Sequence, residues 1–276
     1  MDRGQRKGRI ADILNKITPK ASENIENNIS DIIYNVIGFL PITECIDNGL
    51  FISNLAYRIA KENINTCIVD FKVFYPNIYQ YLDAKPNDKG KGLLNILKND
   101  KEDIRTQITV TKYKQLYLLS PSPYDLVEDY IECKFPMIER VINELKEMFD
   151  VVLIDIPNNP PLEFCIGAMK YIHRGFFTSA QRTDTTINMI KLLDFGKSIG
   201  VSTAKFSSVI FLNTQDVPYD YDCISKIGFN ISAKIPLVKN EVSDYLAGKL
   251  YIKDSTLLDK NYVSEINKLV DLIISS

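Results

Sequence analysis

Short, continuous apolar runs alternate with amphipathic stretches along the chain from about residue 31 onward. A run such as 151–156 has no polar face, which is typical of a strand buried on both sides in a parallel sheet. The stretch Phe135–Met148 carries apolar residues three and four positions apart, which predicts an amphipathic helix. The same patterns predict strands at 32–39, 66–71, 116–119, 151–156, 174–179, 207–212 and 230–235, and helices at 50–60, 93–97, 135–148, 186–199 and 263–274. This alternation predicts an α/β fold with a doubly wound, mainly parallel sheet and helices on both faces.

Residues 1–30 differ from the rest and predict a basic N-terminal arm or short helix, followed by one α/β domain over 31–276. Residues 1–20 carry six basic and two acidic side chains. The apolar residues of this segment recur at helical spacing and would share one face: Ile10, Ile13, Leu14 and Ile17. Two interpretations stay open. The segment is either a helix packed on the main domain or a frayed arm, or it is a docking helix for a partner or an anionic surface.

The charges of the chain nearly cancel, with 33 basic and 35 acidic residues and a formal net charge of −2. Such a chain is a poor candidate for a dedicated nucleic-acid-binding protein, although it is compatible with a local basic patch. One histidine and five scattered cysteines leave little material for a histidine-dependent triad or a metal site, so no metal site is predicted. No apolar run reaches the length of about 18 residues that a transmembrane helix needs, and we expect a cytoplasmic protein.

The loop after the first predicted strand lacks the chemistry of a phosphate-binding loop. Such a loop needs glycines whose backbone N–H groups wrap the phosphates, a lysine for their charge, and a Ser or Thr for Mg²⁺. Residues 40–49 contain one glycine, no lysine and two acids, Glu44 and Asp47, that would repel phosphate. By contrast, Asp70 and Asp155 stand near the ends of buried strands, where a carboxylate can hold Mg²⁺-bound water or can cap a neighbouring loop.

Seven segments between residues 31 and 274 carry a resemblance to a known family. The segment ISNLA at 52–56 resembles that family's motif AANLA. The segment CIVDF at 67–71 resembles its motif VLLIDLD, and DVVLIDIP at 150–157 resembles its motif YDVVIIDTPP. The further matches are GLLNIL at 92–97, YLLSPS at 117–122, ISAKIP at 231–236 and AGK at 247–249. Each segment is weak alone, but their order makes the chain similar to the MinD/ParA family of deviant Walker P-loop ATPases, which belong to the SIMIBI class.

The same resemblance identifies where the chain departs from that family. Aligned backward from residues 54–56, the family's phosphate lysine falls on Asn48, its Mg²⁺ threonine on Gly49 and its signature lysine on Thr43. The second aspartate of the strand motif, which the family associates with hydrolysis, falls on Lys72. The degenerate loop comprises Thr43, Glu44, Cys45, Asp47, Asn48 and Gly49.

The resemblance also gives four positions equivalent to nucleotide-binding residues of the family: Asp70, Asp155, Asn213 and Pro236. Asp70 and Asp155 keep the family's carboxylates. Asn213 matches its adenine-contacting asparagine, although an asparagine in a loop is more often part of a turn. No residue is predicted to be catalytic.

The resemblance and the erased loop together imply a ParA/MinD-like pseudo-ATPase, similar to TadZ/CpaE-like members, that acts in positioning, partition or assembly through protein–protein contacts. We expect no cofactor, a homodimer, and a protein partner from a localisation or assembly machinery at a cell pole, a membrane complex or the nucleoid. The first alternative is an active ATPase that uses ATP and Mg²⁺ in a rearranged phosphate site, with Lys72 or a lysine of a second subunit near the phosphates. The second is a DNA-binding partition protein whose basic arm contacts phosphates. Taken together, these interpretations favour a protein that is not an enzyme.

Overall fold

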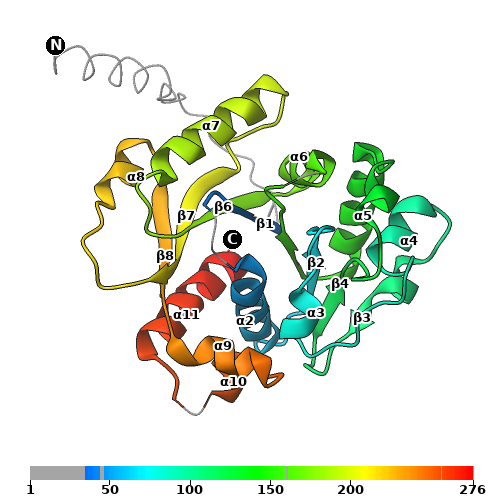
Figure 1. Ribbon diagram of the computed structural model, residues 1–276, viewed down its shortest axis with the longest axis horizontal. Helices are drawn as coiled ribbons and strands as arrows, with labels where there is room; N and C mark the ends of the chain where they lie inside the picture. The colour runs from blue at the N-terminus through cyan, green and yellow to red at the C-terminus, as the bar shows by residue number, and fades with distance from the viewer. Residues whose placement is uncertain (1–34, 44–46, 160, 256, 276) are drawn as a thin grey trace.

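The computed structural model describes residues 35–43, 47–159, 161–255 and 257–275, and its centre is one eight-stranded sheet (Figure 1). The strands are β1 (Val36–Pro41), β2 (Thr66–Asp70), β3 (Thr109–Val110), β4 (Leu116–Leu119), β5 (Val151–Asp155), β6 (Arg174–Ser179), β7 (Phe206–Thr214) and β8 (Asn230–Pro236). They lie in the order β3-β4-β2-β5-β1-β6-β7-β8, and every neighbouring pair is parallel except β3 and β4. The predicted fold class is therefore confirmed.

Helices cover both faces of the sheet (Figure 1). One face packs against α4 (Leu93–Lys98), α5 (Phe135–Met148), α6 (Leu162–Tyr171), α7 (Thr185–Ser198) and α8 (Asp222–Lys226). The other packs against α2 (Asn48–Ala60), α3 (Ile78–Tyr81), α10 (Tyr251–Asp254) and α11 (Lys260–Ile274), and α9 (Lys239–Leu246) lies beside α10. Two 3₁₀ turns, η1 (Ile104–Gln107) and η2 (Val127–Tyr130), lie in the connections.

Strand β1 illustrates why the strands appear as continuous apolar runs. Val36 and Leu40 belong to the core on the α5 side, whereas Ile37 and Phe39 belong to the core on the α2 side. Successive side chains of a strand point to opposite faces, so a strand covered on both faces needs apolar residues at every position. In the strand order, β2, β5 and β1 are neighbours and parallel. Their carboxyl ends therefore lie side by side, at one end of a sheet that is covered on both faces.

The predicted elements that fall in the described residues are all present, with ends that differ by a few residues. The unpredicted ones are short or weakly patterned: β3, α3, α6, α8, α9 and α10. The predicted arm at 1–30 lies outside the described residues, as do residues 32–34 of the first predicted strand, so the division at residue 31 stays a prediction. In the described ranges, no helix has the length and apolar character needed to cross a lipid bilayer.

Close packing between β6 and β7 depends on the absence of a side chain at Gly175. A Cβ placed there would lie 2.3 Å from a ring carbon of Phe206. The Phe206 ring is buried and stacks on Phe177 with 4.9 Å between ring centroids. Because Phe177 blocks the ring from moving aside, the glycine is a packing requirement.

We expect Gly175→Ala to lower the free energy of unfolding by about 1–3 kcal/mol, the usual cost of overpacking a filled core. In a Phe206→Leu background the same substitution should cost less, because the smaller side chain frees the space that the new methyl group needs. Urea unfolding of the four proteins measures both values. Equal costs in the two backgrounds would contradict this account of the packing.

Candidate functional site

The site predicted from the sequence lies where the carboxyl ends of β1, β2 and β5 meet. Asp70 ends β2 and Asp155 ends β5, and the two residues are directly paired in the register of the parallel strands. Both carboxylates are completely buried, with 0% of each residue exposed. Two ionised carboxylates side by side in a buried position are unfavourable unless a cation or a proton compensates them.

Lys72 supplies that compensating charge from within the chain. Its Nζ atom lies 2.7 Å from Oδ2 of Asp155, an ion pair at hydrogen-bonding distance. The lysine side chain is itself 19% exposed. Burial raises the pKa of Asp155, and the charge of Lys72 opposes this rise. Burial alone would lower the pKa of Lys72, but Asp155 and Asp70 together raise it above its usual value, so the lysine stays charged.

Asp70 holds the loop that follows β2. One of its oxygens accepts the backbone N–H of Lys72 at 2.9 Å, and the other accepts the N–H groups of Asn77 at 3.2 Å and Ile78 at 3.4 Å. Burial, followed by the neighbouring Asp155, raises the pKa of the Asp70 carboxyl to about 7, while Lys72 and the backbone N–H groups act in the opposite direction. Asp70 therefore has a structural role in shaping the loop between β2 and α3.

Asn48, on which the sequence resemblance places the family's phosphate lysine, is fully buried. Its Nδ2 group donates to Oδ1 of Asp155 and to the carbonyl of Phe39, each at 3.1 Å. Its Oδ1 atom accepts a hydrogen bond of 2.7 Å from the hydroxyl of Thr178. The amide thus joins the ends of β1, β5 and β6 and directs its hydrogen bonds to protein groups.

The two residues that flank Asn48 also have structural roles. Asp47 caps α2 by accepting the backbone N–H of Leu50 at 3.1 Å, and its other oxygen accepts the hydroxyl of Tyr81. At Gly49, where the resemblance places the family's Mg²⁺ threonine, a Cβ would lie 2.7 Å from Oδ1 of Asn77. Side-chain atoms of Ile78 and Tyr81 would lie 3.1 and 3.2 Å from the same Cβ, so a threonine here requires at least the Asn77 side chain to move.

The remaining predicted residues are not joined to this cluster by any described contact. Thr43 is buried, and its hydroxyl accepts the backbone N–H of Ala180 at 2.9 Å. Asn213 was expected in a loop but lies within β7, two strands from β1, where its left-handed backbone with φ of 55° falls at an irregularity in the pairing of β7 with β8. Pro236 ends β8, one strand further.

Two of the predicted loop residues, Glu44 and Cys45, lie outside the described part of the chain. Three partners of the cluster were not predicted from the sequence: Asn77, Tyr81 and Thr178. Thr178 is a polar residue near the end of an apolar strand, which was the one available signal, whereas the roles of Asn77 and Tyr81 depend on contacts between distant parts of the chain.

The described residues fit a magnesium nucleotide poorly. The oxygens of Asp155 already face the ammonium of Lys72 and the amide of Asn48, and the space beside Gly49 is filled. Across the described ranges, no group of three or more His, Cys, Asp and Glu side chains is arranged to hold a metal ion. The arrangement can hold a fixed set of charges and hydrogen bonds, and it links α2 and α3 to the ends of four strands, β1, β2, β5 and β6.

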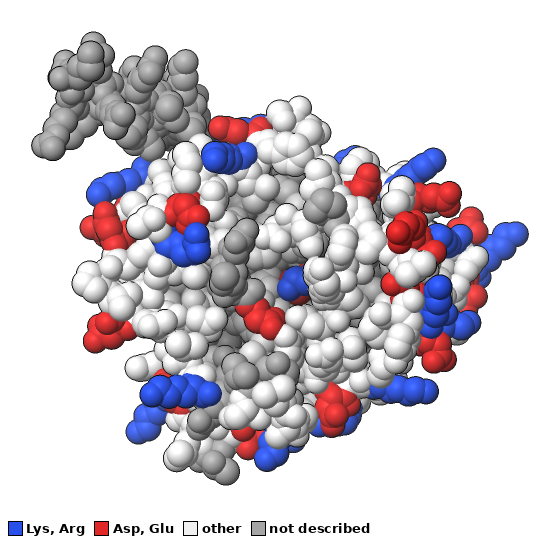
Figure 2. All heavy atoms as spheres, viewed as in Figure 1, with Lys and Arg blue, Asp and Glu red and all other residues white. Residues whose placement is uncertain are grey.

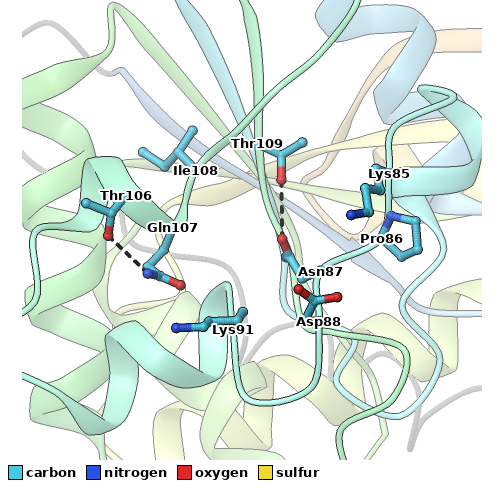
Figure 3. Close-up of a pocket in the computed structure, with 9 residues that line it drawn as sticks. All are labelled: Lys85, Pro86, Asn87, Asp88, Lys91, Thr106, Gln107, Ile108 and Thr109. Carbon is cyan, nitrogen blue, oxygen red and sulfur yellow. Dashed lines mark hydrogen bonds between the residues drawn. The ribbon is translucent and has the colours of Figure 1, made fainter.

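A hollow of about 390 Å³, away from this cluster, lies between the loop 85–91 and the segment 106–109 that leads into β3 (Figure 3). Asn87 contacts Thr109 there, with 3.5 Å between Oδ1 and the hydroxyl oxygen. Lys85, Asp88 and Lys91 bring charges of both signs to its lining. None of the predicted site residues lines this hollow, and its mixed charge differs from a phosphate-binding loop.

Replacing Lys72 with methionine should destabilise the protein by about 3–5 kcal/mol, because Asp155 would be left as a buried charge without a cation. The double variant K72M/D155N should recover most of this loss, since the asparagine carries no charge and still offers an oxygen to Asn48. Urea unfolding of the wild type, both single variants and the double variant tests the coupling. Additive effects would show that the ion pair does not compensate Asp155.

The raised pKa of Asp70 predicts that stability falls as pH rises. The folded protein holds a proton that the unfolded chain, with an ordinary aspartate pKa near 4, releases first. The associated stabilisation is complete at about pH 4 and is lost as pH increases through about 7, by up to about 1.4 kcal/mol per pH unit. Asp70→Asn should flatten this dependence in urea unfolding, whereas Asp88→Asn, at an exposed position, should leave it unchanged. A wild-type stability that rises over this range would contradict the prediction.

No family model matches the chain, and no curated protein matches it. Solved structures do match. MinD in a MinC:MinD cell division complex from Aquifex aeolicus is 13% identical with a TM-score of 0.72, over 88% of this chain and 96% of that one. MinD from Pyrococcus horikoshii complexed with Mg-ADP is 17% identical with a TM-score of 0.71, over 87% and 95%. A ParA family ATPase from Chlorobium tepidum is 16% identical with a TM-score of 0.71, over 88% and 100%. The resemblance to MinD and ParA proteins is thus confirmed at the level of the fold, which this chain shares with them over most of its length.

Proposed function

We propose that this protein is a ParA/MinD-like pseudo-ATPase that acts in positioning, partition or assembly through protein–protein contacts. The observation that carries the proposal is the ion pair between Lys72 and Asp155, at 2.7 Å in a buried position. In the family to which the sequence is similar, the equivalent of Asp155 faces Mg²⁺-bound water, and the equivalent of Lys72 is an aspartate. Here a lysine ammonium takes the place of the metal as the neutralising charge.

The ammonium of Lys72 is part of the chain and does not come and go as a ligand does, which affects how the protein would respond to nucleotide. A ligand changes a conformational equilibrium only if it binds one state more tightly than another. Lys72, Asn48 and Asp70 hold the edge of the sheet together without a ligand. The surface formed by the loops around this edge would then be present at all times, and its partners would bind it independently of nucleotide.

The proposed partners follow from the neighbours in fold. One of these is a MinD in a cell division complex with MinC, and another is McdA from a Cyanothece species. We propose a homodimer and a protein partner in a localisation or assembly machinery at a cell pole, a membrane complex or the nucleoid. The charge distribution favours protein over nucleic acid, because basic and acidic side chains are interspersed on the face shown in Figure 2.

Isothermal titration of the full chain with ATP and Mg²⁺ tests the proposal, together with sedimentation analysis. We expect no saturable heat, no phosphate release above background, and the same sedimentation with and without nucleotide. The electrostatic reason is that the phosphates would meet Asp47 and Glu44 without the loop lysine, and a like-charge contact at about 4 Å is repulsive even at an effective dielectric constant of about 20.

Asp155→Ala is the matched control for residual activity. Saturable binding and steady phosphate release that disappear in Asp155→Ala would overturn the pseudo-ATPase assignment in favour of an active ATPase with a rearranged site. Conversion of monomer to dimer by ATP and Mg²⁺ would overturn the proposed independence from nucleotide.

A further inference from the structure

An apolar groove of about 300 Å³ lies beside the carboxyl end of β1 and is separate from the Lys72 cluster. Its walls come from the end of β1, the loop after β5 and the outer side of α7. Ile42 contributes from the end of β1, and Leu192 and Phe195 contribute from α7. The groove thus combines backbone of the sheet edge with one face of a helix.

Hydrogen bonds fix the walls of this groove. The side-chain amide of Asn158 donates to the carbonyl of Pro41 at 3.2 Å, and that of Asn188 donates to the carbonyl of Ile42 at 3.1 Å. These two amides tie the loop after β5 and helix α7 to the end of β1. The groove is therefore held in shape by its own polar groups.

The outer face of α7 continues the apolar surface beyond the groove. Leu192, Phe195 and Ile199 are three and four residues apart, which places them on one side of the helical segment. Phe195 remains 38% exposed and Ile199 remains 41% exposed. Large apolar side chains that form such an exposed stripe are typical of a surface that another segment covers.

We propose that residues 10–17 of this same chain occupy the groove and the adjoining stripe of α7. This segment carries its own stripe at matching helical spacing: Ile10, Ile13, Leu14 and Ile17. Two such stripes can pack against each other and remove both from water. The occupant lies in residues 1–34, outside the described ranges.

The connection between this segment and the groove is long enough. Residues 18–34 join it to Asn35, which directly precedes β1. Seventeen extended residues reach roughly 55 Å, whereas the six residues of β1 separate Asn35 from the groove by only about 20 Å. A tether that spans its site easily gives the attached segment a high effective concentration there, so binding within one chain is favoured over binding between chains.

The proposal goes beyond the proposed function and does not depend on it, because no nucleotide-site residue takes part. An intramolecular cover of this kind makes the α7 surface available only when the segment leaves it. A partner that uses this surface must compete with residues 10–17, and removal of the segment exposes the surface permanently. Residues 10–17 would thereby compete with any partner for the α7 surface.

Hydrogen–deuterium exchange of the full chain at low protein concentration tests the proposal. In the wild type, we expect the amides of residues 10–17 to exchange about tenfold more slowly than in an isolated peptide of the same sequence. Phe195→Glu should abolish this protection, and so should Ile13→Glu. Leu126→Glu is the matched control, since Leu126 is 54% exposed but lies outside both α7 and the groove, and it should leave the protection intact. Unchanged thermal unfolding of the core in each variant identifies the effect as local.

Four results would overturn the proposal. The first is exchange of residues 10–17 at the peptide rate in the wild type, and the second is equal protection in Phe195→Glu and the wild type. The third is protection that disappears on dilution together with a loss of dimer, which would assign the groove to the arm of a second copy. A variant without residues 1–30 should show faster exchange in α7, and unchanged exchange there would also contradict the proposal.

Discussion

Two buried carboxylates on neighbouring strands set the main constraint on this molecule. Asp70 and Asp155 are paired in the register of β2 and β5, and neither has access to water. The fold can bury them together only if positive charge or a proton is present, because the repulsion and the lost hydration are large in a dry sheet. Lys72 meets this requirement, and the β2–α3 loop that carries it wraps around Asp70. The position of that loop is a consequence of the charge balance.

The hydrophobic pattern was sufficient to predict most of the fold. Strands such as β5 are covered on both faces, so their apolar runs are continuous. Helix α5 buries a single stripe of four aliphatic residues, so its apolar positions recur at helical spacing and differ clearly from those of a strand. The pattern failed where an element is too short, or, as in the ten residues of α6, too weakly patterned, to show a period. β3 has two residues, and α3 and α10 have four each, so tertiary contacts decide their conformation.

The site was predicted in part. The sequence places Asn48 after the first predicted strand and Asp70 and Asp155 near the ends of two others, and the structure brings these three residues close together. The alignment could not show that Lys72 pairs with Asp155, since a substituted position in an alignment does not say which side chain its new residue contacts. Asn213 has no described contact with the cluster and lies within β7, at an irregularity in its pairing with β8.

The crowding at Gly49 has an evolutionary consequence. A variant with a threonine at this position would have to displace the Asn77 side chain, and the helix that follows Asn77 also places Tyr81 on Asp47. A single substitution there would therefore disturb the contacts of α3 without building a phosphate-binding loop. Such a loop would need several coordinated substitutions in two segments of the chain, so we expect variation to be tolerated more readily at the surface than at this end of the sheet.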